Sequence, residues 1–134
     1  MNKVKAVSVW FSAGTLGGIT NAVFVWGTGA CGVNALLGIQ ITPQWSPAFL
    51  YQRMVWGGIW GFMFALPYLK KSIWRRGFLF GLAPTLAVLT VVLPFQLNKG
   101  MFGLGLGSLV PVFAVMANAI WGITAAWWVE KAEK

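Results

Sequence analysis

Four long runs of apolar residues, separated by short polar or glycine-rich stretches, dominate the pattern of this chain. They cover approximately residues 6–26, 47–69, 77–95 and 108–129. An α-helix rises about 1.5 Å per residue, so about 20 apolar residues cross the roughly 30 Å hydrocarbon layer of a bilayer. The pattern predicts an all-α integral membrane protein, a single domain over residues 1–134 built as a four-transmembrane-helix bundle.

Local signals refine the boundaries of these runs. Ser46 followed by Pro47 is typical of a helix start, because serine caps the first turn and proline fits within it. Pro84 lies inside the third run and predicts a kink or a freed backbone carbonyl. The stretch 27–45 is weakly apolar and interrupted by glycine and proline. Three paths stay open for it: along the interface, re-entrant, or as an extension of the first helix.

Composition supports the membrane assignment. The chain is 58% hydrophobic and 9% charged, whereas a soluble domain is about 25% charged. So little polar surface disfavours a soluble enzyme, a disulfide scaffold, a disordered tail and a nucleic-acid-binding domain. The net charge of +8 does not point to a nucleic-acid partner, because the basic residues flank the apolar runs.

The basic residues are distributed unevenly between the two sides that four spans would create. One side receives Lys3, Lys5, Lys70, Lys71, Arg75, Arg76, Lys131 and Lys134, and the other receives Arg53 and Lys99. Cytoplasmic loops carry the excess of Lys and Arg, so we expect both termini in the cytoplasm. This is typical of a multi-pass protein of the bacterial inner membrane.

The middle loop of the predicted cytoplasmic side concentrates positive charge. Lys70, Lys71, Arg75 and Arg76 surround a tryptophan within seven residues. Basic residues beside a membrane attract anionic lipids. We therefore expect this loop to face lipid, with membrane lipids as partners of the protein.

Residues that usually perform catalysis are absent from the sequence. The chain contains no histidine and no aspartate, and both glutamates, Glu130 and Glu133, follow the last apolar run. General acid–base catalysis and hard metal sites depend on these residue types. We expect no enzyme activity, no metal and no cofactor.

Small residues recur at four-residue spacing in every predicted span. The rows are Gly14 and Gly18, Gly57 and Gly61, Gly77 and Gly81, and Ala114, Asn118, Gly122 and Ala126. Such rows let helix backbones approach closely inside a membrane. They serve either to pack the four helices of one chain or, if one row is left over, to bind a second subunit or another membrane protein.

Polar side chains at membrane depth are the candidate binding residues. Arg53 lies inside the second predicted span beside Gln52, while Asn21 and Asn118 lie inside the first and fourth. Lys99 is predicted on the same side as Arg53. Together these residues are candidates to contact an anion, a lipid phosphate or a solute. The alternative is that Arg53 reaches outward to the interface and the asparagines bond between helices.

Two functions fit these observations. The first is a non-catalytic structural or accessory protein that binds a membrane partner or lipid. The second is a homo-oligomeric channel or carrier for an anion or small solute, with Arg53, Asn21 and Asn118 near the path.

Overall fold

A computed structural model describes residues 2–133, and every regular element in this part of the chain is a helix. In order these are α1 (Lys3–Ala30), α2 (Val33–Leu36), α3 (Pro47–Trp60), the 3-10 helix η1 (Gly61–Ala65), α4 (Ile73–Ala87), the π-helix η2 (Val88–Gln96), the 3-10 helix η3 (Met101–Leu106) and α5 (Val110–Glu133). The all-α prediction is confirmed. Two segments, Ile73–Gln96 and Val110–Glu133, are long and apolar enough to cross a membrane.

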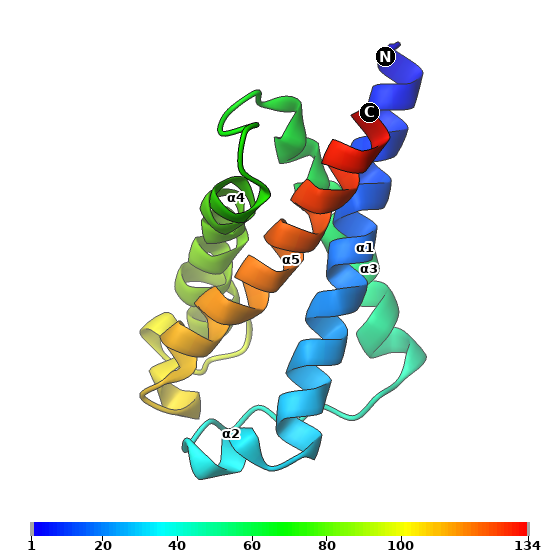
Figure 1. Cartoon of the computed structure of the whole chain (residues 1–134). Coiled ribbons are helices and arrows are strands. Elements are labelled where there is room, and N and C mark those ends of the chain that lie inside the picture. The colour runs from blue at the N-terminus through cyan, green and yellow to red at the C-terminus, as the bar shows by residue number, and fades with distance from the viewer. Residues whose placement is uncertain (1, 134) are drawn as a thin grey trace.

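The long helices run between two ends of the molecule (Figure 1). The first turn of α1, the last turn of α5 and the connection between η1 and α4 lie at one end, here called the terminal end. The segments 31–46 and 97–109 lie at the opposite end, the loop end. The basic residues predicted to share one side gather at the terminal end, except Lys134, which lies outside the described residues.

Serine side chains begin two of the helices. The Ser46 hydroxyl accepts a hydrogen bond from the Phe49 amide, with Pro47 in the first turn, as the sequence predicts. Ser72 accepts from the Arg75 amide in the same way, so α4 begins four residues earlier than the predicted span. The second helical run ends earlier than predicted, because η1 stops at Ala65 and the chain turns extended at Leu66.

The stretch 27–45 combines an extension of the first helix with a surface crossing. α1 continues to Ala30, and the short α2 follows after the left-handed Gly32. The chain then runs without regular structure to the start of α3. Along the way the Gln40 amide donates to the Leu106 carbonyl at 2.7 Å, which joins the two segments of the loop end.

Glycines set the spacing between the helices. A Cβ on Gly14 or Gly57 would lie within 3.0 Å of backbone atoms of the facing helix, so α1 and α3 touch backbone to backbone. Gly77 and Gly122 bring α4 and α5 together in the same way. The helices therefore pack as α3 on α1, α1 on α5 and α5 on α4, with glycine rows within this one chain at the contacts.

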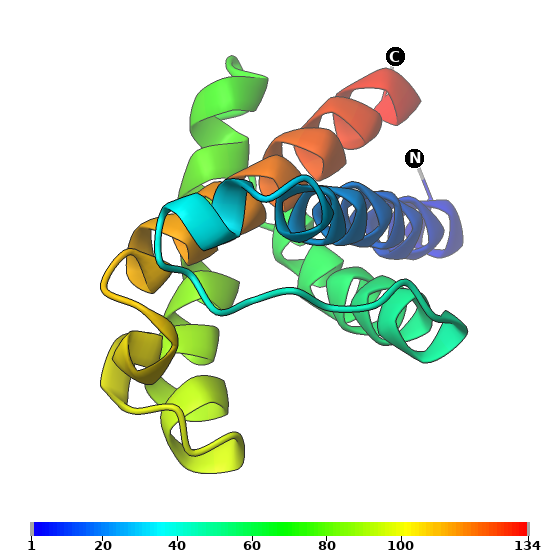
Figure 2. The ribbon, with the colours of Figure 1, turned by 90° about the horizontal axis from the view of Figure 1, so that it is seen from below.

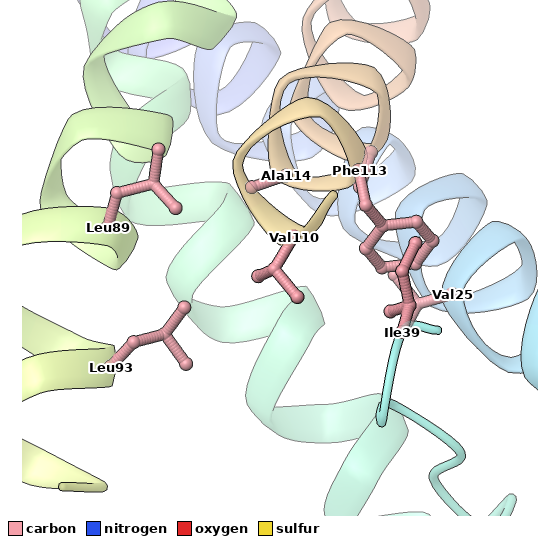
Figure 3. Packing of buried hydrophobic residues seen from close by; sticks show 8 residues of the cluster. Val25, Ile39, Leu89, Leu93, Val110, Phe113 and Ala114 are labelled. Atoms are coloured by element: carbon pink, nitrogen blue, oxygen red, sulfur yellow. The ribbon is translucent and has the colours of Figure 1, made fainter. Parts of the chain in front are cut away.

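Buried apolar residues form two clusters at different heights. The cluster toward the loop end contains Val25, Ile39, Leu89, Leu93, Val110, Phe113, Ala114 and Ala117 (Figure 3). The cluster toward the terminal end contains Ala13, Phe64, Phe80, Trp121, Ala125, Ala126 and Val129. The first cluster surrounds a cavity, whereas the second fills the space between the helices with aromatic rings.

Candidate functional site

A cavity of about 470 Å³ opens among the helices in the half of the molecule near the loop end. Residues from α1, α3, η2 and α5 line it, together with the crossing segment 40–43. We call it the Arg53 cavity, because Arg53 is the charged residue in its lining. No acidic side chain lines it, since both glutamates lie in the last turns of α5 at the other end.

Three predicted polar residues meet in this cavity. Asn21 from α1, Arg53 from α3 and Asn118 from α5 all line it. Arg53 Nη1 donates to Asn21 Oδ1 at 2.6 Å, and Asn21 Nδ2 donates to the Ala117 carbonyl at 2.9 Å. This chain of bonds links α3, α1 and α5 and fixes the orientation of the Asn21 amide.

The direction of Arg53 follows from the packing of its helix. Gly18 on α1 faces the Arg53 backbone so closely that a Cβ there would lie 2.3 Å from the Arg53 carbonyl oxygen. This contact fixes the rotation of α3 and turns the Arg53 side chain toward α1 and α5. The guanidinium carbon also lies 4.6 Å from the centre of the Phe49 ring, a cation–π contact.

Hydrogen-bonding capacity remains in the cavity after these contacts. Arg53 carries five N–H donors, of which one bonds to Asn21. Among residues 2–133 the Asn118 side chain has no hydrogen-bond partner, although it lines the cavity and is half-buried. A guanidinium beside a free amide suits a carboxylate or phosphate, which accepts several N–H bonds at once.

A smaller cavity of about 130 Å³ adjoins the same polar residues. Asn21, Arg53 and Asn118 line both cavities, and tryptophans 56, 60 and 121 line the smaller one. Beyond it toward the terminal end, the Phe64 ring lies 5.0 Å from the Phe80 ring and 6.1 Å from that of Trp121. We call these three rings the aromatic barrier, because they are buried and pack against one another on the terminal side of the cavities.

Trp121 is held in the barrier by a hydrogen bond between helices. Its indole Nε1 donates to the Gly14 carbonyl at 3.1 Å, and the side chain is 3% exposed. The same ring contacts Gly17, where a Cβ would lie 2.8 Å from Trp121 Cδ1. Glycine at these positions of α1 therefore makes room for the barrier.

Two other predicted site residues lie outside the cavity. Gln52 is exposed and does not line it, because α3 turns the side chain beside Arg53 away from α1. Lys99 is exposed in the loop-end connection and does not line it either. The structure therefore joins Arg53 with the two asparagines and leaves the glutamine and the lysine apart.

The prediction that Arg76 faces lipid is wrong. The side chain is 3% exposed, and its Nη2 donates to the carbonyls of Phe64 at 3.0 Å and Leu66 at 3.1 Å. Its guanidinium carbon lies 5.0 Å from the centre of the Phe64 ring and 5.5 Å from that of Phe80. Arg76 thus satisfies one carbonyl of η1 and one carbonyl directly after it, at the point where the helical path ends.

The other three basic residues of this loop do gather on the surface. Lys70, Lys71 and Arg75 are exposed and line a hollow of about 420 Å³ at the terminal end. Ser72 at the start of α4 also lines it. We call this the basic hollow, and its charge is uncompensated by any acidic residue in its lining.

Sequence reasoning missed the apolar wall of the cavity. Val88, Val92 and Leu93 come from η2, where the helix widens to π geometry, and Leu97 follows directly. Pro94, which has no N–H, lies within that segment. π segments occur often at functional sites, but the sequence itself reads here as an ordinary apolar helix.

Comparisons of the chain with protein-family models, with curated proteins and with solved structures find no match.

Proposed function

We propose that the protein is a non-catalytic, four-span membrane protein of the carrier type that binds a small anionic solute in the Arg53 cavity. The observation that carries this proposal is the meeting of Arg53, Asn21 and Asn118 around one cavity without an acidic partner. The binding site lies within a single chain and needs no second copy.

Membrane insertion is supported by the surface of the helices. Large apolar side chains are exposed on every long helix, among them Val23, Ile59, Leu86 and Met116. Soluble monomers rarely expose contiguous apolar patches beyond a few hundred Å². The proposed spans are α1, α3 with η1, α4 with η2, and α5, with the basic terminal end in the cytoplasm.

The energetics of an arginine at membrane depth support an anionic ligand. An arginine inside a membrane helix is costly, at least about 2.5 kcal/mol at the bilayer centre, and Arg53 lies about 9 Å from the start of its helix. The Asn21 carbonyl oxygen and the Phe49 ring offset part of this cost, but they carry no negative charge. An anion seated on Arg53 supplies the missing charge.

A carrier is favoured over an open channel because the interior is closed on one side of the site. The aromatic barrier lies between the Arg53 cavity and the terminal end, and Arg76 fills the space beside it. Neither cavity that Arg53 lines includes Phe64 or Phe80 in its lining. Passage requires the barrier to move, which is typical of carriers.

Flux into proteoliposomes tests this function. The purified protein is reconstituted into vesicles that enclose an anion-sensitive reporter whose signal does not depend on pH. Small inorganic and organic anions are added outside, and their uptake is followed by the signal of the enclosed reporter. We expect uptake that saturates with concentration and that Arg53→Gln abolishes. Arg75→Gln serves as the matched control, because it removes an exposed arginine from the terminal end. Equal uptake by Arg53→Gln and the unsubstituted protein would show that Arg53 binds no transported anion.

A second candidate function is an accessory protein held by anionic lipids at its cytoplasmic face. The basic hollow favours it, because Lys70, Lys71 and Arg75 share one cavity. The glycine rows give no support to the version with a protein partner, since they contact helices of the same chain. Charge reversal at Lys71 and Arg75 tests the lipid version, and unchanged co-purification of anionic lipid would exclude it.

A further inference from the structure

We infer that the ligand of the Arg53 cavity is a small organic monoanion with an apolar body, bound with its charged end innermost. The inference rests on the proposed anion-binding function and names the chemical class of the solute. It comes from the order in which polar and apolar groups follow one another along the cavity.

The polar groups form a layer inside the molecule. Arg53 lies about 9 Å along α3 from Pro47, at about 1.5 Å per residue. By the same rise, Asn118 lies about 12 Å from the start of α5 and Asn21 about 13 Å from the end of α1. All three helix ends belong to the loop end, so the three side chains lie at similar depth.

Mostly apolar residues line the cavity between this polar layer and the loop end, where Gln40 and Thr42 of the crossing segment add two polar residues to the lining. Leu93 and Val110 line the cavity there, and their side chains lie between η2 and α5 in Figure 3. Phe113, Leu97 and Leu106 add further apolar surface. A ligand that reaches Arg53 from this side therefore places its anionic group inward and its remaining atoms against apolar walls.

This order of polar and apolar residues disfavours a phospholipid or an inorganic anion as the ligand. A phospholipid keeps its phosphate at the interface and its chains inward, so it would have to lie in the reverse orientation. An inorganic anion would gain nothing from the apolar walls and would lose hydration beside them. A carboxylate on an alkyl or aryl group matches both layers, because the carboxylate meets the polar layer and the alkyl or aryl group meets the apolar walls.

The size and the open side of the cavity agree with a small molecule. Its volume of about 470 Å³ falls in the range of roughly 300–1,000 Å³ that is typical of small-molecule sites. α3 shares no extensive contact with α4 or η2, and Figure 2 shows α3 and η2 diverging when seen from the loop end. Residues of both helices line the cavity, which therefore lies where they diverge.

Binding of a homologous series of carboxylates tests the inference. The protein is placed in nanodiscs of zwitterionic lipid, and tryptophan fluorescence is measured during titration with acetate, butanoate, hexanoate, neutral hexanamide and inorganic phosphate. Trp56, Trp60 and Trp121 line the adjoining cavity and report on it. Empty nanodiscs correct for partition of hexanoate into the bilayer. We expect affinity to rise about fourfold per added methylene, the ratio that burial of one methylene gives.

Two sets of variants separate recognition of the ligand's charge from recognition of its apolar part. Arg53→Gln should weaken hexanoate binding at least about tenfold, and Arg53→Lys should retain part of it. Lys99→Gln should leave it unchanged, because Lys99 is exposed and does not line the cavity. Val92→Thr adds a hydroxyl to the cavity wall and should reduce the gain per methylene. Val91→Thr is the matched control, because Val91 is exposed and does not line the cavity.

The outcomes distinguish this inference from the function on which it rests. A rise in affinity from acetate to hexanoate that depends on Arg53 supports both. Equal binding of phosphate, acetate and hexanoate would overturn the inference and leave the anion-binding function standing. Binding of hexanamide as tight as that of hexanoate, or displacement of hexanoate by anionic phospholipid added to the nanodisc, would also overturn it. Absence of binding by every anion would overturn both.

Discussion

Substitution of Gly18 by alanine should separate α1 from α3 and disturb the Arg53 site together. A Cβ at Gly18 would lie 2.3 Å from the Arg53 carbonyl oxygen and 3.1 Å from Met54 Cα. Both are backbone atoms, so no side chain can rotate away. The helices must part by about 1 Å to restore an ordinary contact, which in well-packed cores costs about 1–3 kcal/mol. The Arg53–Asn21 bond, now 2.6 Å long, would exceed hydrogen-bonding distance after such a shift.

Gly27→Ala is the matched control, because Gly27 lies in the same helix and a Cβ there meets nothing within 4 Å. Both variants gain the same intrinsic helix preference, about 1 kcal/mol in favour of alanine. Because these gains cancel, the difference in unfolding free energy isolates the contact, and we expect Gly18→Ala to be less stable than Gly27→Ala by about 1–3 kcal/mol.

Reversible unfolding in mixed detergent micelles, followed by circular dichroism, measures this difference. A titration of hexanoate on the same samples should show weaker binding by Gly18→Ala alone. If the two variants were equally stable and bound the ligand equally, α1 and α3 would not pack at backbone distance. The account of why Arg53 faces the cavity would then be wrong.

Three further substitutions test the remaining contacts, each by the same unfolding measurement. Arg76→Gln should lower the unfolding free energy by about 1.5–3 kcal/mol, because two carbonyls lose a charged donor. Arg75→Gln, the control, should change it by less than about 0.5 kcal/mol. Equal effects of the two substitutions would contradict the burial of Arg76. Trp121→Phe should cost about 1 kcal/mol through the lost bond to the Gly14 carbonyl, and an unchanged stability would show that this bond is not formed. Asn21→Ala should cost about 1–3 kcal/mol, since Ala117 loses its donor and Arg53 its acceptor; a neutral result would show that the bonds between α1, α3 and α5 do not stabilise the protein.

The helices could be predicted because their signals are local. Long apolar runs, the Ser46–Pro47 start and the glycine spacing all act within one or two turns, and the structure contains a helix at each run. The boundary at residue 69 failed because Pro67 and the turn around Leu69, which has a φ of 57°, end the helical path early. Ile73–Gln96 and Val110–Glu133 are long and apolar enough to cross a membrane, and the crossing itself stays a prediction for all four runs.

The candidate site could be predicted only in part. Polar residues inside the apolar runs singled out Arg53, Asn21 and Asn118, and the structure places all three in the lining of one cavity. The side chain next to Arg53 points the other way, because successive residues on a helix lie about 100° apart and the rotation of α3 depends on Gly18. Arg76 was misplaced because its partners are carbonyls at the end of η1 and directly after it, which only the turn between η1 and α4 brings close.

The most direct test of the central claim is to locate a bound organic anion by anomalous scattering. Crystals grown in a lipid mesophase with 4-bromobenzoate would carry a bromine atom whose position is unambiguous. We predict the bromine beside Leu93 and Val110, with the carboxylate at hydrogen-bonding distance from Arg53. Bromine found only at the basic hollow beside Lys70, or at no position inside the Arg53 cavity, would contradict the account.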